Sequence, residues 1–259
     1  MEVQSLQLVE QLATKKQTIY QDSKLRYILR SMLASMFIGF GVIVAFKTGN
    51  FFYLEHSPWT YPMAAITFGA AIILIVYGGG DLATGDTFYY SYAALRKKLG
   101  WAEAARMWIV SYIGNIMGAA VFALLILTTG LFADAMVNGF LLAVVEKKMT
   151  TPILELFFRG ILCNWLVCMA FFVPMSLKGD GAKMFAMMLF VFCFFISGYE
   201  HSIANMCTFA IALVLHHPGT ISWGGVFHNL IPVTIGNIIG GGIFMGYMYH
   251  FVNKPYLDK

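Results

Sequence analysis

Two short polar segments bring titratable side chains into strongly apolar surroundings. The first is GGGDLATGD, residues 78–86, and the second is SGYEHSIAN, residues 197–205. Each interrupts a stretch that would otherwise predict one membrane span. Hydrocarbon tolerates an unwound, charge-bearing backbone only where it is buried in protein or lines a cavity. A pair of such breaks in matching halves therefore indicates a permeation pathway.

Among the histidines, His201 is the best candidate for a chemical role, because it is the one predicted to lie deep in the membrane. An imidazole exchanges protons near neutral pH, and ionisable groups inside spans usually serve a function. The alternative is a hydrogen-bonded core histidine. Glu200 and Asp81 are expected to support the breaks as acceptors for freed backbone N–H groups, or, for Glu200, to set the tautomer of the imidazole.

Composition indicates an integral membrane protein, since 59% of the residues are hydrophobic, 12% are charged and the mean hydropathy is +0.72. A chain of 259 residues accommodates about six helical spans with their loops. The four cysteines all fall in apolar segments, which predicts neither disulfides nor a zinc site. No metal, cofactor or nucleic-acid partner is expected, and no removable signal peptide is predicted.

The hydrophobic pattern predicts an all-α membrane domain over residues 27–252. Residues 1–26 are predicted to form an amphipathic segment at the membrane surface, with a frayed tail as the alternative, and residues 253–259 form a tail. Most of the 17 Lys and Arg residues fall on one side of a six-span topology, which predicts a cytoplasmic-membrane protein with both termini in the cytoplasm. The six predicted spans are 27–46, 61–95 (broken at 78–86), 106–132, 153–177, 183–215 (broken at 197–201) and 223–252.

An internal repeat appears in the letters of the sequence. IGNIMG at 113–118 recurs as IGNIIG at 235–240, Phe37-Ile38-Gly39 matches Phe158-Arg159-Gly160, and Gly80 aligns with Gly198. Each repeat holds three spans, so the second copy must enter the membrane from the opposite side, which predicts an inverted 3+3 repeat. The glycines of the hexamers are expected to allow close helix packing, and Asn115 and Asn237 to hold the unwound segments.

Three segments carry a resemblance to a known family. They are residues 78–85, residues 160–170 (GILCNWLVCMA) and residues 197–206, and together they resemble the signature segments of the formate/nitrite transporter family, most closely its nitrite channel branch. The resemblance implies a homopentamer of six-span protomers with an aquaporin-like fold and broken second and fifth helices. Each protomer would hold a pore for a small monovalent anion. Ala83 stands where the family usually has an aromatic residue.

The same resemblance implies roles for individual residues. His201 corresponds to the central pore histidine and Thr84 to the threonine that faces it. Asn164 is expected near the inner part of the pathway, and Lys148 at the outer vestibule, where a cation concentrates anions. Two apolar constrictions are implied: Leu82 with Phe194 on the outer side, and Ile72 with Val167 on the inner side.

These expectations favour a channel or transporter for small weak-acid anions, nitrite first, with proton-linked passage assisted by His201. Formate and hydrosulfide are the alternatives within the family. A neutral-solute channel of the aquaporin type is disfavoured because Ala204-Asn205 does not precede a proline. A haem or quinone enzyme would need paired deep histidines, and a structural protein would not need Asp81, Glu200 and His201 at helix breaks.

Overall fold

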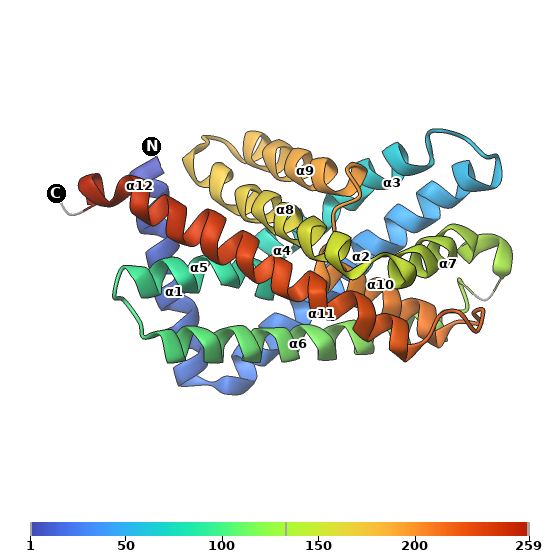
Figure 1. Ribbon diagram of the computed structural model, residues 1–259, viewed down its shortest axis with the longest axis horizontal. Helices are drawn as coiled ribbons and strands as arrows, with labels where there is room; N and C mark the ends of the chain where they lie inside the picture. Colours follow the sequence, from blue (N-terminus) through green and yellow to red (C-terminus); the bar gives the residue numbers. More distant parts are fainter. Residues whose placement is uncertain (1, 133, 258–259) are drawn as a thin grey trace.

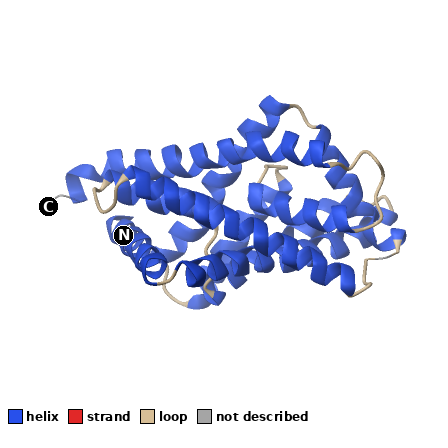
Figure 2. Cartoon of the chain, turned by 90° about the horizontal axis from the view of Figure 1, so that it is seen from below, coloured by secondary structure: helices blue, strands red, loops and turns tan. Residues whose placement is uncertain are grey.

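The computed structural model describes residues 2–132 and 134–257, and within these ranges all the regular elements are helices joined by short loops (Figure 2). Long helices run along the longest axis of the molecule, and the two termini lie at the same end (Figure 1). The helices are α1 (Glu2–Asp22), α2 (Lys24–Leu54), α3 (Thr60–Phe68), α4 (Ala70–Gly78), α5 (Ala83–Leu95), α6 (Trp101–Thr128), α7 (Ala135–Thr150), α8 (Ile153–Phe172), η1 (Val173–Ser176), α9 (Asp180–Ile196), α10 (Ser202–Val214), α11 (Trp223–Ile239), the π-helix η2 (Gly240–Tyr247) and α12 (Met248–Leu257).

Several of these helices have the length and apolarity of membrane spans. Within the described residues, five helical stretches meet both criteria: Lys24–Leu54, Thr60–Gly78, Trp101–Thr128, Ile153–Ser176 and Trp223–Leu257. The shorter helix α10 is also apolar. A helix of about 20 residues matches the hydrocarbon thickness of a bilayer, so the chain is built as a multi-pass membrane protein.

Helix α1 differs from the expected surface segment. Its side chains Leu6, Val9 and Ala13 are fully buried, and they pack in one cluster with Phe88 and Tyr90 of α5. These three positions recur at helical spacing, so they form one apolar stripe, and α5 covers that stripe. The frayed-tail alternative is wrong, and α1 is part of the packed protein.

Helix α7 lies between the predicted spans 106–132 and 153–177, in a region for which the sequence predicts only a connection. It begins after Asp134, whose side-chain Oδ1 accepts a hydrogen bond from the N–H of Met136 at 2.8 Å. Phe140 of α7 is buried against Phe46 of α2, with ring centroids 5.3 Å apart. The segment was missed because it is too short to span a membrane and ends in Glu146, Lys147 and Lys148.

Two helix pairs pack closely through small residues. A side chain at Gly118 of α6 would lie 2.2 Å from the carbonyl oxygen of Met32 in α2. A side chain at Gly240, directly after α11, would lie 2.4 Å from the carbonyl oxygen of Ile161 in α8. The prediction that these glycines allow close packing is confirmed.

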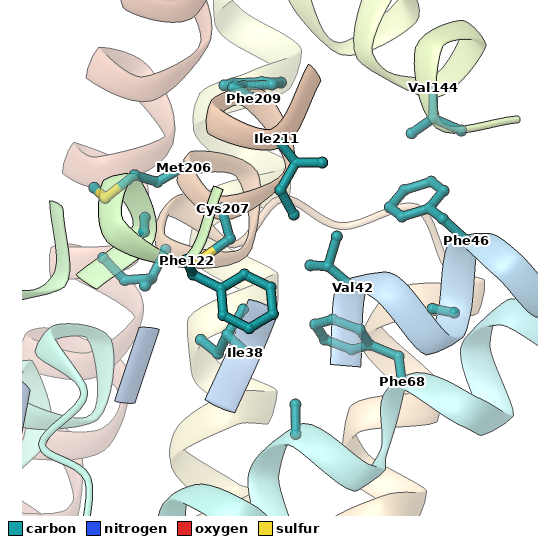
Figure 3. Close-up of a cluster of buried hydrophobic side chains, with 14 of the residues drawn as sticks. Ile38, Val42, Phe46, Phe68, Phe122, Val144, Met206, Cys207, Phe209 and Ile211 are labelled. Atoms are coloured by element: carbon teal, nitrogen blue, oxygen red, sulfur yellow. The ribbon is translucent and has the colours of Figure 1, made fainter. Parts of the chain in front are cut away.

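A large apolar core holds the α2–α6 pair against α10. Ile38 and Val42 of α2 face Met206, Cys207 and Ile211 of α10, with neighbours from α3, α6 and α7 around them (Figure 3). These side chains are at most 7% exposed. The core fixes helix α10 from the second half of the chain against helices of the first half, so both breaks belong to one packed unit.

Candidate functional site at the two helix breaks

The two breaks have the same backbone conformation. After α4, Gly79 adopts φ +75° and Leu82 is extended (φ −100°, ψ 118°) before α5 begins. After α9, Gly198 adopts φ +72° and His201 is extended (φ −107°, ψ 114°) before α10 begins. Glycine suits the left-handed conformation because it has no Cβ. Gly79 therefore corresponds to Gly198, and the predicted alignment of Gly80 with Gly198 is one residue out of register.

One asparagine holds each break. Asn115 Oδ1 accepts from the N–H of Ala83 at 2.9 Å, and Asn115 Nδ2 donates to the carbonyls of Ser31 and Asp81. In the second half, Asn237 Oδ1 accepts from the N–H of Ser202 at 2.8 Å. Its Nδ2 donates to the carbonyls of Gly160 and Glu200. Each amide thus satisfies backbone groups that the unwound segment leaves without helical partners.

The first helices of the two halves align in a different register from the one that the repeated sequence motifs predict. The N–H of Asp81 donates to the carbonyl of Arg30, and the N–H of Glu200 donates to the carbonyl of Arg159. Arg30 and Arg159 are therefore equivalent positions, and the predicted match of Phe37-Ile38-Gly39 with Phe158-Arg159-Gly160 is wrong. The first half has more residues between its first helix and its break than the second half has. One constant offset in residue number therefore cannot align both the first helices and the breaks.

His201 and Thr84 meet between the two breaks. His201 Nε2 lies 2.8 Å from Thr84 Oγ1, and both residues are buried. His201 Nδ1 accepts a hydrogen bond from the N–H of Ala204 at 3.0 Å, capping α10. Since Nδ1 acts as the acceptor, the neutral imidazole carries its hydrogen on Nε2 and donates it to Thr84. The threonine hydroxyl keeps its own hydrogen for another acceptor.

A cavity of about 280 Å³ opens on one side of this pair. Its lining includes His201, Phe194, Lys148, Glu200 and Arg159. The ring of Phe194 stacks near that of His201, with centroids 6.0 Å apart. Lys148 Nζ lies 2.8 Å from Glu200 Oε2, so the predicted vestibule lysine is held in an ion pair. The Glu200 carboxylate contacts Lys148, and the Nδ1 of His201 is held by the N–H of Ala204 and not by Glu200.

A second cavity, of about 390 Å³, is lined among others by Leu82 and Gly85, which lie two residues before and one residue after Thr84. Leu82 and Phe194 therefore line different cavities, and the constriction that they are predicted to share stays a prediction. By the pseudo-symmetry, Leu82 occupies the position in the first break that His201 occupies in the second. His201 thus lines the first cavity, while Leu82 and Gly85 line the second. Thr84 itself lines a third cavity, of about 320 Å³, together with Ala83 and Thr87.

The remaining predicted site residues support the breaks from behind. Asn164 Nδ2 donates to the carbonyls of Thr84 and Asn237 and to Thr87 Oγ1, and so links the two halves. Ile72 and Val167 are buried in the core and line neither of the two cavities. The structure thus brings His201, Thr84 and Phe194 together and places Asn164, Ile72 and Val167 around them.

A buried ionic cluster beside the second cavity was missed from the sequence. Lys16 of α1 contacts Asp86 Oδ1 and lies 3.1 Å from Asp81 Oδ1. Arg30 Nε lies 2.6 Å from Asp81 Oδ2. Burial lowers the pKa of Lys16, but the carboxylates of Asp86 and Asp81 more than offset this and hold it above its ordinary value. The sequence held one sign of this cluster: Asp86 ends the first polar segment, at the position where the second segment has Asn205.

An all-helical, multi-pass membrane protein with two half-helices meeting at a buried His–Thr pair has the architecture of a membrane channel or transporter. Comparison with known proteins agrees. The formate/nitrite transporter family model matches residues 4–251, and the chain belongs to this family. Its members are channels and transporters, which are not enzymes.

Individual relatives cover nearly the whole chain. It is 61% identical over 253 residues to the uncharacterized transporter YwcJ of Bacillus subtilis (strain 168), with 98% of this chain and 99% of that protein covered. It is 34% identical to the nitrite transporter NirC of Escherichia coli (strain K12), over 92% of this chain and 89% of NirC.

Two solved structures are also similar. An FNT family ion channel superposes with a TM-score of 0.90 at 30% identity, covering 96% of this chain and 98% of that one. A pentameric formate channel with formate bound gives a TM-score of 0.75 at 26% identity, covering 92% of this chain and 99% of that one.

Proposed function

We propose that this protein conducts small monovalent anions of weak acids across the cytoplasmic membrane, past the His201–Thr84 pair. The observation that carries the proposal is the buried 2.8 Å contact between His201 Nε2 and Thr84 Oγ1, two residues that each line a cavity. The likeness to NirC supports nitrite as the substrate, and the likeness to the solved formate channel supports formate equally. Hydrosulfide is a third small anion of this class.

Energetics favour passage that is linked to a proton. Moving a bare anion into a dry apolar segment costs tens of kcal/mol by idealised solvation, and about several kcal/mol after relaxation. Protonating an acid with a pKa of about 3.5 at neutral pH costs only about 5 kcal/mol. The neutral acid therefore offers the cheaper route past buried apolar residues such as Leu82 and Phe194.

The residues act in sequence along the path. Arg159 and Lys148 give the first cavity cationic groups that attract an anion, and the Glu200 carboxylate limits the strength of that attraction. At the midpoint the imidazole Nε2–H and the Thr84 hydroxyl can both donate to the anion. To transfer a proton to the anion, His201 must first take one at Nδ1, which breaks the hydrogen bond from the N–H of Ala204, and it then recovers a proton from the other side.

The quaternary and topological parts of the proposal follow the family. We propose six spans in an inverted 3+3 repeat of the aquaporin-like type, assembled as a homopentamer in the lipid membrane. The equivalent hydrogen bonds of Asn115 and Asn237 support the repeat. The position of both termini at one end of the molecule supports a cytoplasmic location for both (Figure 1).

Flux measurements on the full chain in proteoliposomes test the proposal. Nitrite and formate uptake are measured at two pH values for the wild type, for His201→Asn and for the control His217→Asn, a half-buried histidine in a loop. We expect His201→Asn to abolish proton-linked flux and His217→Asn to retain it. Unchanged flux and pH dependence in His201→Asn would remove His201 from the mechanism. Osmotic swelling without anion uptake would favour a neutral-solute channel.

A further inference from the structure

The pseudo-symmetry of the breaks relates two polar clusters. In the second break, Lys148 Nζ pairs with Glu200, and Asn205 Nδ2 donates to the same carboxylate oxygen. In the first break, Asp81 occupies the position of Glu200 and Asp86 occupies that of Asn205, each 119 residues earlier. Lys16 completes the first cluster, although it comes from α1 and has no sequence equivalence to Lys148.

At one equivalent position the clusters differ in a titratable group, and the first cluster also holds Arg30, which pairs with Asp81, whereas the equivalent Arg159 pairs with Glu155. Asn205 is a neutral amide whose Nδ2 also lies 2.8 Å from Asn229 Oδ1. Asp86 is a carboxylic acid at the equivalent place, and its side chain is fully buried. In the cluster at the first cavity, the charge of Asn205 therefore cannot change. In the cluster at the second cavity, Asp86 can gain a proton.

Asp86 is held entirely by protein groups. Its Oδ1 contacts Lys16, and its Oδ2 accepts a hydrogen bond from the Tyr27 hydroxyl at 3.0 Å. The Tyr27 and Tyr90 hydroxyls are 3.1 Å apart. The charged and titratable groups that face Asp86 are Lys16 of α1, Tyr27 and Arg30 of α2, Asp81 of the break, Tyr89 and Tyr90 of α5, and Cys168 of α8.

The charge of this cluster depends on the protonation of Asp86. With Asp81 and Asp86 both ionised, their charges balance those of Lys16 and Arg30. When Asp86 takes a proton, the two cations face one carboxylate, and the cluster carries a net charge of one. Lys16, Arg30 and Asp81 line the second cavity together with Asp180 and Lys183, which pair with each other, so an anion in that cavity is exposed to the added charge.

We propose that the second cavity is a binding site for a small monovalent anion together with a proton, and that Asp86 holds the proton. The proton passes from water to the Asp86 carboxylate, while Lys16 and Arg30 keep theirs. Anion affinity in this cavity then rises as pH falls. The inference rests on the proposed anion transport, and it adds a second proton-binding residue on the opposite side of His201.

The test uses the purified full-length protein with nitrite and formate as probes. Affinity and proton uptake are measured by calorimetry in buffers of different ionisation enthalpy, between about pH 5 and about pH 8. For the wild type we expect affinity to rise about tenfold toward acid pH, with proton uptake on binding. Asp86→Asn introduces a neutral amide, the group that Asn205 provides in the second break. We therefore expect this variant to bind the anion at every pH as tightly as the wild type does at acid pH, with reduced proton uptake.

Two further variants complete the design. Asp86→Glu keeps a titratable carboxylate and should keep the pH dependence, which a purely structural role for Asp86 does not predict. Tyr27→Phe removes a donor to the ionised carboxylate, so the pH midpoint of the affinity change should move upward. This variant tests the inference even if Asp86→Asn does not fold.

The outcomes separate the two proposals. The same pH dependence in the wild type and in folded Asp86→Asn would overturn the role of Asp86, and so would an unshifted midpoint in Tyr27→Phe. Failure of the wild type to bind either anion at any pH, together with absent flux, would overturn the proposed function itself.

Discussion

The two helix breaks share one backbone and differ in their side chains. Both have a glycine with positive φ, an extended residue before the new helix, and an asparagine that binds the unwound segment. The extended residue is Leu82 in the first break and His201 in the second. The fold thus duplicates the parts that satisfy buried backbone groups, while each half contributes different chemistry at the same position.

The physical reason is the cost of a buried polar group without a partner. Such a backbone group costs about 1–3 kcal/mol, so both breaks need an amide with the reach of Asn115 or Asn237. No such requirement acts on the side chain that points toward a cavity. One break can therefore present an imidazole where the other presents an apolar side chain.

The largest expected effect comes from removing the shared asparagines. Asn115→Ala and Asn237→Ala each leave one N–H and two carbonyls without their partner, which should cost about 4 kcal/mol of folding free energy. Thermal unfolding in detergent measures the loss. Asn253→Ala, which removes a single local bond to the carbonyl of Tyr249, should cost about 1 kcal/mol. If the two variants lost widely different amounts of folding free energy, Asn115 and Asn237 would not have equivalent roles in the two breaks.

The second prediction separates the two ionic clusters. Lys16→Met leaves Asp86 without its cation, and Lys148→Met leaves Glu200 without its cation, so each should cost about 3 kcal/mol at neutral pH. Both losses should shrink toward about pH 5, since protonated carboxylates need no cation. In the wild type, the raised pKa of Lys16 means that its contribution is complete below about pH 10.4 and is lost only as pH rises through the raised value. Unfolding measured as a function of pH, together with proteolysis of α1, tests these signs.

A third prediction concerns the contact between the halves. Thr84→Val removes the hydroxyl that accepts from His201 Nε2 and should lower nitrite flux about tenfold, the equivalent of one hydrogen bond. Thr67→Val in α3 removes a hydroxyl that bonds its own helix and should leave flux unchanged. Equal flux in the two variants would argue against a role for the Thr84 hydroxyl.

The smallest effects are expected at the two glycines. Gly79→Ala and Gly198→Ala place a Cβ in a left-handed conformation, which should cost about 1–2 kcal/mol each. The Gly181→Ala control lies in helix α9 with open space around it, so it should be neutral or stabilising. A neutral result at only one of the breaks would show that their backbones relax differently.

Much of the architecture was predictable, because membrane spans and their interruptions are local features. The breaks near 78–86 and 197–205 and the packing of the hexamer glycines follow from hydropathy and small-residue spacing. Helix α7 and the burial of α1 were missed, since a short helix or an amphipathic helix has the same sequence pattern whether it lies on a surface or packs into a core. The register between the halves was wrong because their first helices are separated from the breaks by different lengths of chain.

The sequence by itself determined that the chain crosses a membrane and bends twice within it, because apolar run length and buried ionisable residues carry that information locally. It also supplied His201 and Thr84 as members of the site through family resemblance. Only the tertiary structure decided that Leu82 is the counterpart of His201 and that Lys16 reaches Asp81 and Asp86. Those relations join positions tens to more than a hundred residues apart, and they depend on how helices pack, which no local pattern encodes.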